Sequence, residues 1–222
     1  MNKKCLIVSG GEFCPLEKTS NQFDYIIACD KGFEYCINLG LKPNIVLGDF
    51  DSISTDFKEH LTKINDCNDM QIQSFPPEKD DTDTMLAVKT ALSKNYNDIT
   101  ILCGFGNRLD HAYANIQTAA YIVQTGGNAK IIGSSDILYA FQNCTQFFPK
   151  KDNHSLSVFS YTEKCTNVCI SGAKYNLENA ELKNTFPLGV SNEWKEEKVQ
   201  ISTGEGILIV IQSLLQKGDT NK

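Results

Sequence analysis

The chain has 222 residues, of which 41% are apolar and 22% charged, and 21 Lys and Arg against 27 Asp and Glu give a formal net charge of −6. This composition is typical of globular proteins and excludes a fibrous or wholly disordered chain. The length suits one large domain or two modest ones. The net acidity argues against nucleic-acid and anionic-membrane partners, which need clustered Lys and Arg, and leaves open a solvated acidic surface or a metal site.

The first two thirds of the chain alternate short apolar runs with amphipathic stretches. The apolar runs predict buried strands at 5–9, 25–29, 45–47, 71–75 and 99–103. The stretches between them predict helices at 32–39, about 56–64, 82–92 and 109–123. Strands that alternate with helices are typical of a doubly wound, mostly parallel sheet, so we predict an α/β fold here. Runs at 129–132 and 137–141 predict further strands at the edge of this sheet.

A polar stretch at 148–154, which contains Pro149, predicts a linker between two domains. Beyond it helical spacing is absent. Apolar runs joined by Gly, Asn and Pro turns predict strands at 156–161, 167–170, 199–202 and 207–211. We therefore predict an α/β domain at 1–147, followed by a small all-β sandwich domain at 148–222.

The cysteines and the lengths of the apolar runs indicate a cytoplasmic protein. Nine cysteines are scattered without a C-x-x-C pair, which favours free thiols over a disulfide framework or a zinc site. The apolar run after Lys4 is too short for a secretory signal, and no run approaches the ~18 residues of a transmembrane helix.

Carboxylates follow four successive strands of the predicted sheet. In sequence order these aspartates are Asp30, Asp49, Asp51, Asp80, Asp83 and Asp110. Ligands of open α/β sheets bind at the carboxyl ends of the strands, and clustered carboxylates favour Mg²⁺, which offsets their repulsion. We expect Gly48 to turn the backbone, so that Asp49 and Asp51 reach one metal. The alternative for any one of these residues is helix capping, with Asp80 or Thr82 as the cap of the third helix.

Basic side chains near these aspartates could bind phosphate. Arg108 follows Gly104 and Gly106 and could clamp a phosphate, or it could form an ion pair with Asp110. His111 is a candidate acid or base, or a packing residue. Lys31 and Lys79 could neutralise phosphate or be solvated surface lysines. The chain has neither the P-loop motif nor G-x-G-x-x-G nor G-x-S-x-G, so a bound nucleotide would be held without those devices.

In their order along the chain, these motifs resemble those of the thiamine pyrophosphokinase family. They are Asp30, GDFDS at 48–52, KDDTD at 79–83, RLDH at 108–111 with Asn115, SGAKYNL at 171–177, and Ser191 with Asn192. Each motif is weak alone, but the ordered set is highly specific and covers the chain from Asp30 to the last predicted strand. The chain departs from the family at Lys31, Met85 and Trp194, which bears on substrate affinity more than on reaction type.

The resemblance implies an α/β nucleotide-binding domain followed by a β-sandwich. It also implies transfer of a diphosphoryl group from ATP to thiamine, which gives AMP and thiamine diphosphate. Mg²⁺ would be the cofactor, ATP the co-substrate, and thiamine the partner substrate. The family implies homodimers whose thiamine site lies between the ATP domain of one subunit and the β domain of the other.

By position, the resemblance also implies a role for each motif residue. The implied metal ligands are Asp49, Asp51, Asp30 and Asp83. The implied catalytic residues are Asp49, Asp51, Asp83, Arg108 and Asp110, with the general base open among Asp30, Asp83 and Asp110. The implied nucleotide-binding residues are Asp30, Lys79, Asp80, Thr82, Arg108, His111 and Asn115. The implied thiamine-binding residues are Ser191 and Asn192, with either Tyr175 or Trp194 stacking on the substrate.

Two other classes of function remain open on the residues alone. One is another metal-dependent enzyme that uses the same aspartates, such as a phosphoesterase or a nucleotidyltransferase. The other is a non-catalytic module that binds thiamine or a nucleotide. The six aspartates of the expected site equal the excess of 27 acidic over 21 basic residues, which favours a metal site as the source of the net acidity.

Overall fold

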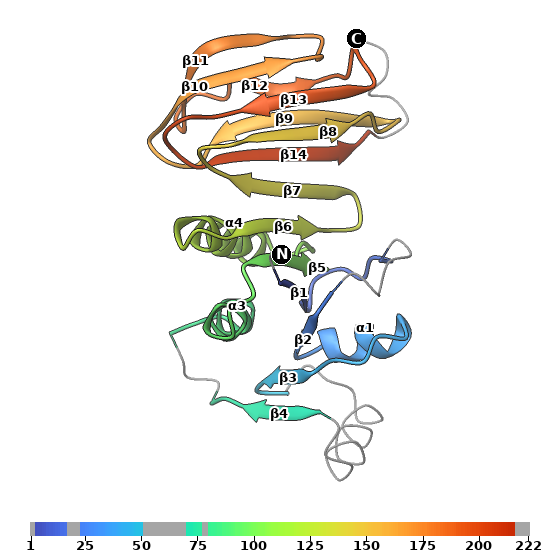
Figure 1. Ribbon diagram of the computed structural model, residues 1–222. Helices are drawn as coiled ribbons and strands as arrows, with labels where there is room; N and C mark the ends of the chain where they lie inside the picture. The colour runs from blue at the N-terminus through green and yellow to red at the C-terminus, as the bar shows by residue number, and fades with distance from the viewer. Residues whose placement is uncertain (1–2, 17–22, 51–69, 77–79, 216–222) are drawn as a thin grey trace. The chain divides into compact units, whose positions relative to one another are not determined.

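The computed structural model describes residues 3–16, 23–50, 70–76 and 80–215. The chain divides into two compact units, Met1–Ser134 and Ser135–Lys222. Figure 1 shows the helices in the first unit and the long antiparallel strands in the second. The predicted helix at 56–64 lies outside the described residues.

The first unit contains a parallel sheet in the strand order β6-β5-β1-β2-β3-β4. The strands are β1 (Lys4–Val8), β2 (Tyr25–Cys29), β3 (Ile45–Gly48), β4 (Gln71–Ser74), β5 (Asp98–Leu102) and β6 (Asn128–Ile132). Every pairing among them is parallel, which confirms the predicted α/β fold. The strand order runs outward from β1 in both directions, so the ligand-binding switch point of such a sheet lies at the carboxyl end of β1.

Three described helices pack on this sheet, α1 (Gly32–Asn38), α3 (Asp83–Ser93) and α4 (Leu109–Gln124). Figure 1 shows α1 on one side of the strands and α3 and α4 on the other, as in a doubly wound fold. The core on the α1 side joins Phe33 and Cys36 of this helix to Leu6 and Val8 of β1. Gly32 allows this packing, because a Cβ there would lie 2.0 Å from the Val8 carbonyl oxygen. No helix among the described residues is long and apolar enough to span a membrane.

The second unit contains two antiparallel sheets, in the orders β12-β9-β14-β7 and β11-β10-β13-β8. Its strands are β7 (Asp136–Phe141), β8 (Thr145–Pro149), β9 (His154–Ser160), β10 (Lys164–Ser171), β11 (Leu177–Lys183), β12 (Gly189–Asn192), β13 (Lys198–Ser202) and β14 (Leu208–Leu214). The core contains side chains of both sheets, including Val158 and Val210 of the first and Val168 and Ile201 of the second. The predicted β-sandwich is confirmed.

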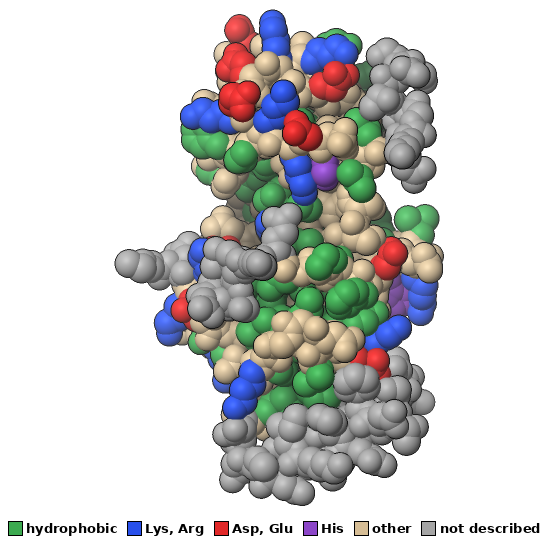
Figure 2. Space-filling model, turned by 90° about the vertical axis from the view of Figure 1, so that its right-hand side faces the viewer, with side chains coloured by type: hydrophobic (Ala, Val, Ile, Leu, Met, Phe, Trp, Pro, Cys, Tyr) green, Lys and Arg blue, Asp and Glu red, His purple; other side chains and the backbone are tan. Residues whose placement is uncertain are grey.

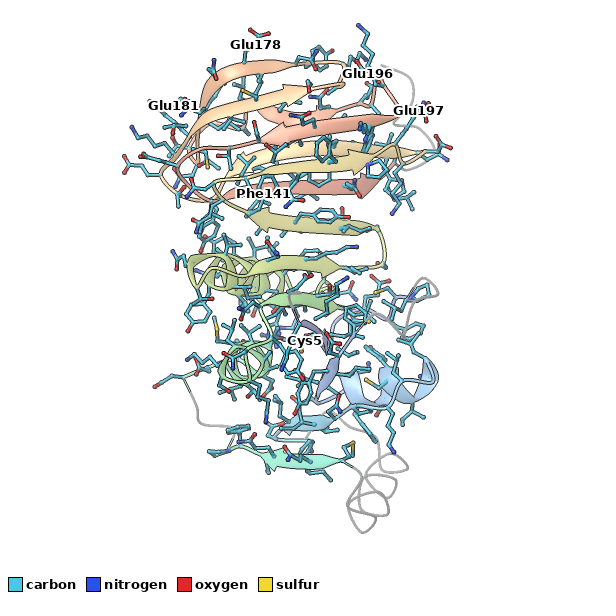
Figure 3. All side chains as sticks on the ribbon, in the orientation of Figure 1. Cys5, Phe141, Glu178, Glu181, Glu196 and Glu197 are labelled. Carbon is cyan, nitrogen blue, oxygen red and sulfur yellow. The ribbon has the colours of Figure 1, made fainter. Side chains whose placement is uncertain are left out.

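The surface of the second unit mixes charges of both signs, as the intermingled red and blue side chains in Figure 2 show. Glu181 of β11, labelled in Figure 3, lies 3.6 Å from the ammonium groups of both Lys164 and Lys183. Lys174 and Glu193 form a closer pair at 2.8 Å. Exposed pairs of this kind contribute little to stability, so the hydrophobic core holds this unit together.

Three strands of the second unit are absent from the sequence prediction, namely β8, β11 and β12. The polar stretch at 148–154, which we expected to link two domains, instead runs from the end of β8 to the start of β9. Phe148 in this stretch is buried with a 3% exposed fraction. The predicted strands at 129–132 and 137–141 are both present, as β6 and β7. The two compact units divide at 134/135, and the domain boundary at 147/148 stays a prediction.

Candidate active site

The backbone turns sharply where β2 and β3 end, and this places Asp30 beside the segment that follows β3. Asp30 and Phe50 have positive φ angles of 44° and 61°. The Asp30 carboxylate oxygen Oδ1 accepts a hydrogen bond from the Phe50 backbone N–H at 3.1 Å. Gly48 has a φ of 148°, and a Cβ at this position would lie 1.7 Å from the same Asp30 oxygen. The expected turn at Gly48 is therefore present, and it depends on a glycine.

Three of the expected site aspartates interact at this edge. The Asp30 carboxyl is hydrogen-bonded to the Asp83 carboxyl, and the charges of Asp83 and Asp49 both act on it. Burial, the bond to Asp83 and these two negative charges raise the pKa of Asp30 to about 7, against the opposing effect of the Phe50 N–H. Like charges crowded in this way favour a bound proton or cation.

Three contacts hold the start of α3, and with it Asp83. The Thr82 hydroxyl oxygen accepts a hydrogen bond from the Met85 backbone N–H at 3.2 Å, which makes Thr82 the N-cap. The hydroxyl groups of Ser9 and Thr84, both buried, lie 3.0 Å apart and join the end of β1 to the helix. The Cys29 thiol donates to the Asp83 carbonyl oxygen at 3.6 Å. Of the two expected caps, Thr82 is confirmed.

Asp81, within the KDDTD motif, is a residue that the sequence analysis did not single out. Its two carboxylate oxygens accept hydrogen bonds from the Lys89 ammonium group at 2.8 and 2.7 Å. The pair ties the segment before α3 to the second turn of this helix. The spacing of eight residues lies outside the usual helical pairs, so no sequence pattern points to it.

Arg108 and Asp110 form the ion pair that the sequence analysis gave as one alternative. Their closest atoms, Nη2 and Oδ2, lie 2.6 Å apart, and both side chains are exposed. The Arg108 guanidinium lowers the pKa of the Asp110 carboxyl. His111 is also exposed. Asn115 is buried, and its side-chain amide donates to the Gly104 carbonyl oxygen at 2.6 Å, so it fixes the segment between β5 and α4.

The expected thiamine-binding residues of the second unit gather around one loop. The Asn192 side chain accepts the Tyr175 N–H at 3.0 Å and donates to the Tyr175 carbonyl oxygen at 2.7 Å, so it positions this residue. Tyr175 is 62% exposed. Trp194 packs against the core, and its indole N–H donates to the Phe148 carbonyl oxygen at 3.0 Å. The exposed Ser191 donates its backbone N–H to the Ser157 hydroxyl at 3.0 Å.

Comparisons with known proteins identify the family of this chain. Two family models match the chain, "Thiamin pyrophosphokinase, catalytic domain" over residues 16–131 and "Thiamin pyrophosphokinase, vitamin B1 binding domain" over residues 145–208. The thiamine pyrophosphokinase of Bacillus subtilis (strain 168) is 30% identical over 188 residues, which cover 84% of this chain and 86% of that protein. The chain belongs to the thiamine pyrophosphokinase family.

Solved structures of thiamine pyrophosphokinases share the fold over nearly the whole chain. The crystal structure of the Bacillus subtilis protein aligns with a TM-score of 0.85 at 28% identity, and covers 96% of this chain and 100% of that one. That of a family protein from Enterococcus faecalis aligns with a TM-score of 0.80 at 26% identity and the same coverage. The chain is an enzyme of this kind, a diphosphotransferase that makes thiamine diphosphate. The alternative functions are not favoured.

Thiamine pyrophosphokinase chemistry raises the question of whether these residues could hold Mg²⁺. Asp30, Asp49 and Asp83 offer hard carboxylate oxygens, and their mutual repulsion is what a divalent cation would relieve, so their chemistry fits the ion. These three aspartates do not form a complete metal site by themselves, because within the described ranges no three His, Cys, Asp or Glu side chains are grouped closely enough to hold a metal ion. Two expected site residues, Asp51 and Lys79, lie outside those ranges, and Asp80 is exposed.

The raised pKa of Asp30 predicts that the metal-free enzyme loses stability as the pH rises. The folded state keeps the Asp30 proton up to about pH 7, whereas the unfolded chain releases it near the ordinary value of 3.8. Between these values the folded state binds more protons, so the free energy of unfolding falls with rising pH. Asp30→Asn removes this titration and keeps an oxygen for the Phe50 N–H. Melting temperatures in EDTA from pH 4.5 to 7.5 should therefore fall less for Asp30→Asn than for the wild type. Parallel pH curves would contradict the prediction.

Proposed function

We propose that this protein is a Mg²⁺-dependent thiamine pyrophosphokinase, which transfers a diphosphoryl group from ATP to the hydroxyethyl oxygen of thiamine. The observation that carries the proposal is the interaction of the Asp30 carboxyl with Asp83 and Asp49, at the carboxyl edge of a doubly wound sheet. Ligands of such sheets bind at this edge. The ordered family motifs are the basis for proposing ATP and thiamine as the substrates.

In this proposal the protein acts mainly by placing charge. Transfers of phosphoryl type need positioning and electrostatic stabilisation, and little covalent chemistry from the protein. Asp49, Asp51, Asp30 and Asp83 would hold Mg²⁺, which would supply positive charge to offset that of the phosphates. Arg108, held by Asp110, would turn its exposed guanidinium to the phosphates. One carboxylate among Asp30, Asp83 and Asp110 would accept the proton of the thiamine hydroxyl.

The reaction products test this function directly. The purified protein is incubated with Mg²⁺, ATP and thiamine, and the nucleotides and thiamine esters are separated by chromatography. We expect AMP and thiamine diphosphate in equal amounts, and neither product without thiamine or in excess EDTA. Formation of ADP, or phosphate release that does not depend on thiamine, would contradict the proposal and favour another metal-dependent enzyme.

For the thiamine site, we propose that Tyr175 rather than Trp194 stacks on the substrate. The Tyr175 ring is exposed, whereas the indole of Trp194 is half-buried and bonded to the Phe148 carbonyl. An aromatic face over the cationic thiazolium or the aminopyrimidine contributes about 0.5–2 kcal/mol. Asn192 holds Tyr175 in place through its two hydrogen bonds to the Tyr175 backbone.

Tyr175→Ala should therefore raise the KM for thiamine by roughly 2- to 30-fold with little change in kcat, since the lost contact is a binding contact. Tyr175→Phe keeps the ring and should leave KM near the wild-type value. Trp194→Phe should lower the melting temperature, because the indole hydrogen bond is lost, and leave KM unchanged. Steady-state kinetics with thiamine varied separate these cases. A raised KM in Trp194→Phe together with a normal one in Tyr175→Ala would reverse the assignment.

We also propose a cytoplasmic homodimer with shared active sites. The eight cysteines that the structure describes are all free thiols, which suits a reducing compartment. Asp49→Asn damages the proposed ATP side of each site, and Ser191→Arg places a repelling cation on the proposed thiamine side.

If the two sides come from different subunits, mixed dimers hold one intact site each. Random mixing of the two inactive variants should then restore about a quarter of the wild-type activity. Activity is measured after the mixture has been dissociated and reassembled, and each variant treated alone is the control. No recovery from a mixture that size-exclusion chromatography shows to be dimeric would contradict the shared site.

A further inference from the structure

Two cysteines that are 89 positions apart in the sequence meet at the carboxyl end of β5. The sulfur atoms of Cys14 and Cys103 lie 3.6 Å apart. The Cys14 backbone N–H points to the Cys103 sulfur at 3.4 Å, and the Cys103 thiol lies 3.9 Å from the Cys14 carbonyl oxygen. The exposed fractions are 2% for Cys14 and 0% for Cys103. The pair is therefore prearranged inside the first unit and shielded from large reagents.

Backbone hydrogen bonds already join the two segments that carry this pair. The Ser9 N–H donates to the Leu102 carbonyl oxygen at 2.9 Å, the Gly11 N–H to the Cys103 carbonyl oxygen at 3.0 Å, and the Glu12 N–H to the Phe105 carbonyl oxygen at 2.7 Å. Residues 9–16 contain no helix or strand, so Cys14 can move without breaking a sheet. A disulfide needs the sulfurs to close to about 2.05 Å, which is a local adjustment from the observed contact.

The two thiols differ in acidity in the way that oxidation requires. The hydrogen bond between the two thiol groups lowers the pKa of Cys14. The same bond, together with burial, raises the pKa of Cys103. Because the thiolate is the form that reacts with peroxides, Cys14 is the group that attacks and Cys103 the group that resolves the product.

We propose that Cys14 and Cys103 form a reversible oxidation site, at which hydrogen peroxide or a comparable small two-electron oxidant makes an intramolecular disulfide. The Cys14 sulfur attacks one peroxide oxygen, the O–O bond breaks, and a sulfenic acid forms with release of one water. The Cys103 thiol then displaces a second water from that sulfur, so the two sulfurs lose the two electrons that the peroxide gains. The bond fastens residues 9–16 to the end of β5, just before the segment that leads to Arg108.

The test uses the full reduced chain and hydrogen peroxide as the oxidant. Remaining thiols are blocked, and the protein is digested without reductant for mass spectrometry. We expect the thiol count in denaturant to fall from nine to seven, with one linked peptide pair that contains Cys14 and Cys103, and to return to nine with dithiothreitol. Nine thiols after peroxide treatment, or linkage through other cysteines instead, would overturn the proposal.

Two variants and an exchange measurement sharpen the result. Cys103→Ser should block the crosslink and leave Cys14 to oxidise to the sulfinic acid. Cys5→Ala changes a buried cysteine of β1, labelled in Figure 3, and should leave the crosslink intact. In the oxidised wild type, hydrogen exchange of the Gly11, Glu12 and Cys14 amides should slow at least tenfold. Unchanged exchange in a fully crosslinked sample would show that the bond does not fasten this segment.

Discussion

Replacing Asp49 with asparagine should lower the turnover of thiamine to thiamine diphosphate by about a hundred- to a thousandfold. The amide has nearly the same shape as the carboxylate but no charge, so it can neither hold a divalent cation well nor organise the phosphates through one. Thiamine binding, measured by calorimetry without nucleotide, should stay within about twofold of the wild type, because the proposed thiamine contacts lie elsewhere. The loss should therefore appear in kcat.

Asp98→Asn is the matched control for this experiment. Asp98 is also half-buried, but it is the first residue of β5 and so lies at the amino edge of the sheet, opposite the proposed site. The same change of charge there should leave turnover within about twofold of the wild type. Equal losses in both variants would mean that the net charge matters rather than the position. Full activity in Asp49→Asn would remove Asp49 from the metal site.

Gly48→Ala should damage both folding and activity, although it adds only one methyl group. The new Cβ would lie 1.7 Å from the Asp30 carboxylate oxygen, and Gly48 has a φ of 148°, which residues with a side chain rarely adopt. We expect a loss of at least about 2 kcal/mol in the free energy of unfolding, since the backbone or Asp30 has to move. Activity of the remaining folded protein should fall about tenfold or more, because Asp30 leaves its place beside Asp83.

Gly40 provides the comparison for conformational strain alone. Its φ is 67°, but a Cβ there would meet nothing within 4 Å. Gly40→Ala should cost only about 1 kcal/mol and leave the kinetics unchanged. Chemical denaturation and steady-state kinetics of both variants distinguish strain from displacement of Asp30. If the two variants behave alike, contact with Asp30 is not what requires a glycine at position 48.

Most strands of the first unit could be predicted because they are short buried runs. The exception is β4, which forms a strand as expected but is mostly exposed rather than buried. The three missed strands of the second unit lack that signal. β11 has the sequence LENAELK, whose residues favour helices, and only its pairing with β10 makes it a strand. β12 is an edge strand of four residues, mostly exposed. For β8, Pro149 and the lysines that follow suggest a linker, although Phe148 beside them is buried.

For the site, chain position was enough to bring carboxylates to one edge of the sheet, but not to show which of them touch. The Asp30–Asp83 pair depends on the turn after β2 and on the exact start of α3, which are tertiary features. The choice between an ion pair and a phosphate clamp for Arg108 needed side-chain coordinates. Side-chain coordinates were also needed to show that Asn115 and Asn192 are hydrogen-bonded to backbone groups. A sequence motif does not distinguish a residue that touches substrate from one that orients its neighbour.

The positive φ angles of Asp30, Phe50 and Cys103 occur where β2, β3 and β5 end. A residue with a side chain held in this conformation costs about 1 kcal/mol or more, and the rest of the fold has to supply that energy. The carboxyl edge of the sheet is thus less stable than it would be with ordinary backbone angles at these positions. Substitutions that relax these three positions would raise the thermal stability of the enzyme but displace the carboxylates. Engineering for thermal stability should therefore begin in the second unit.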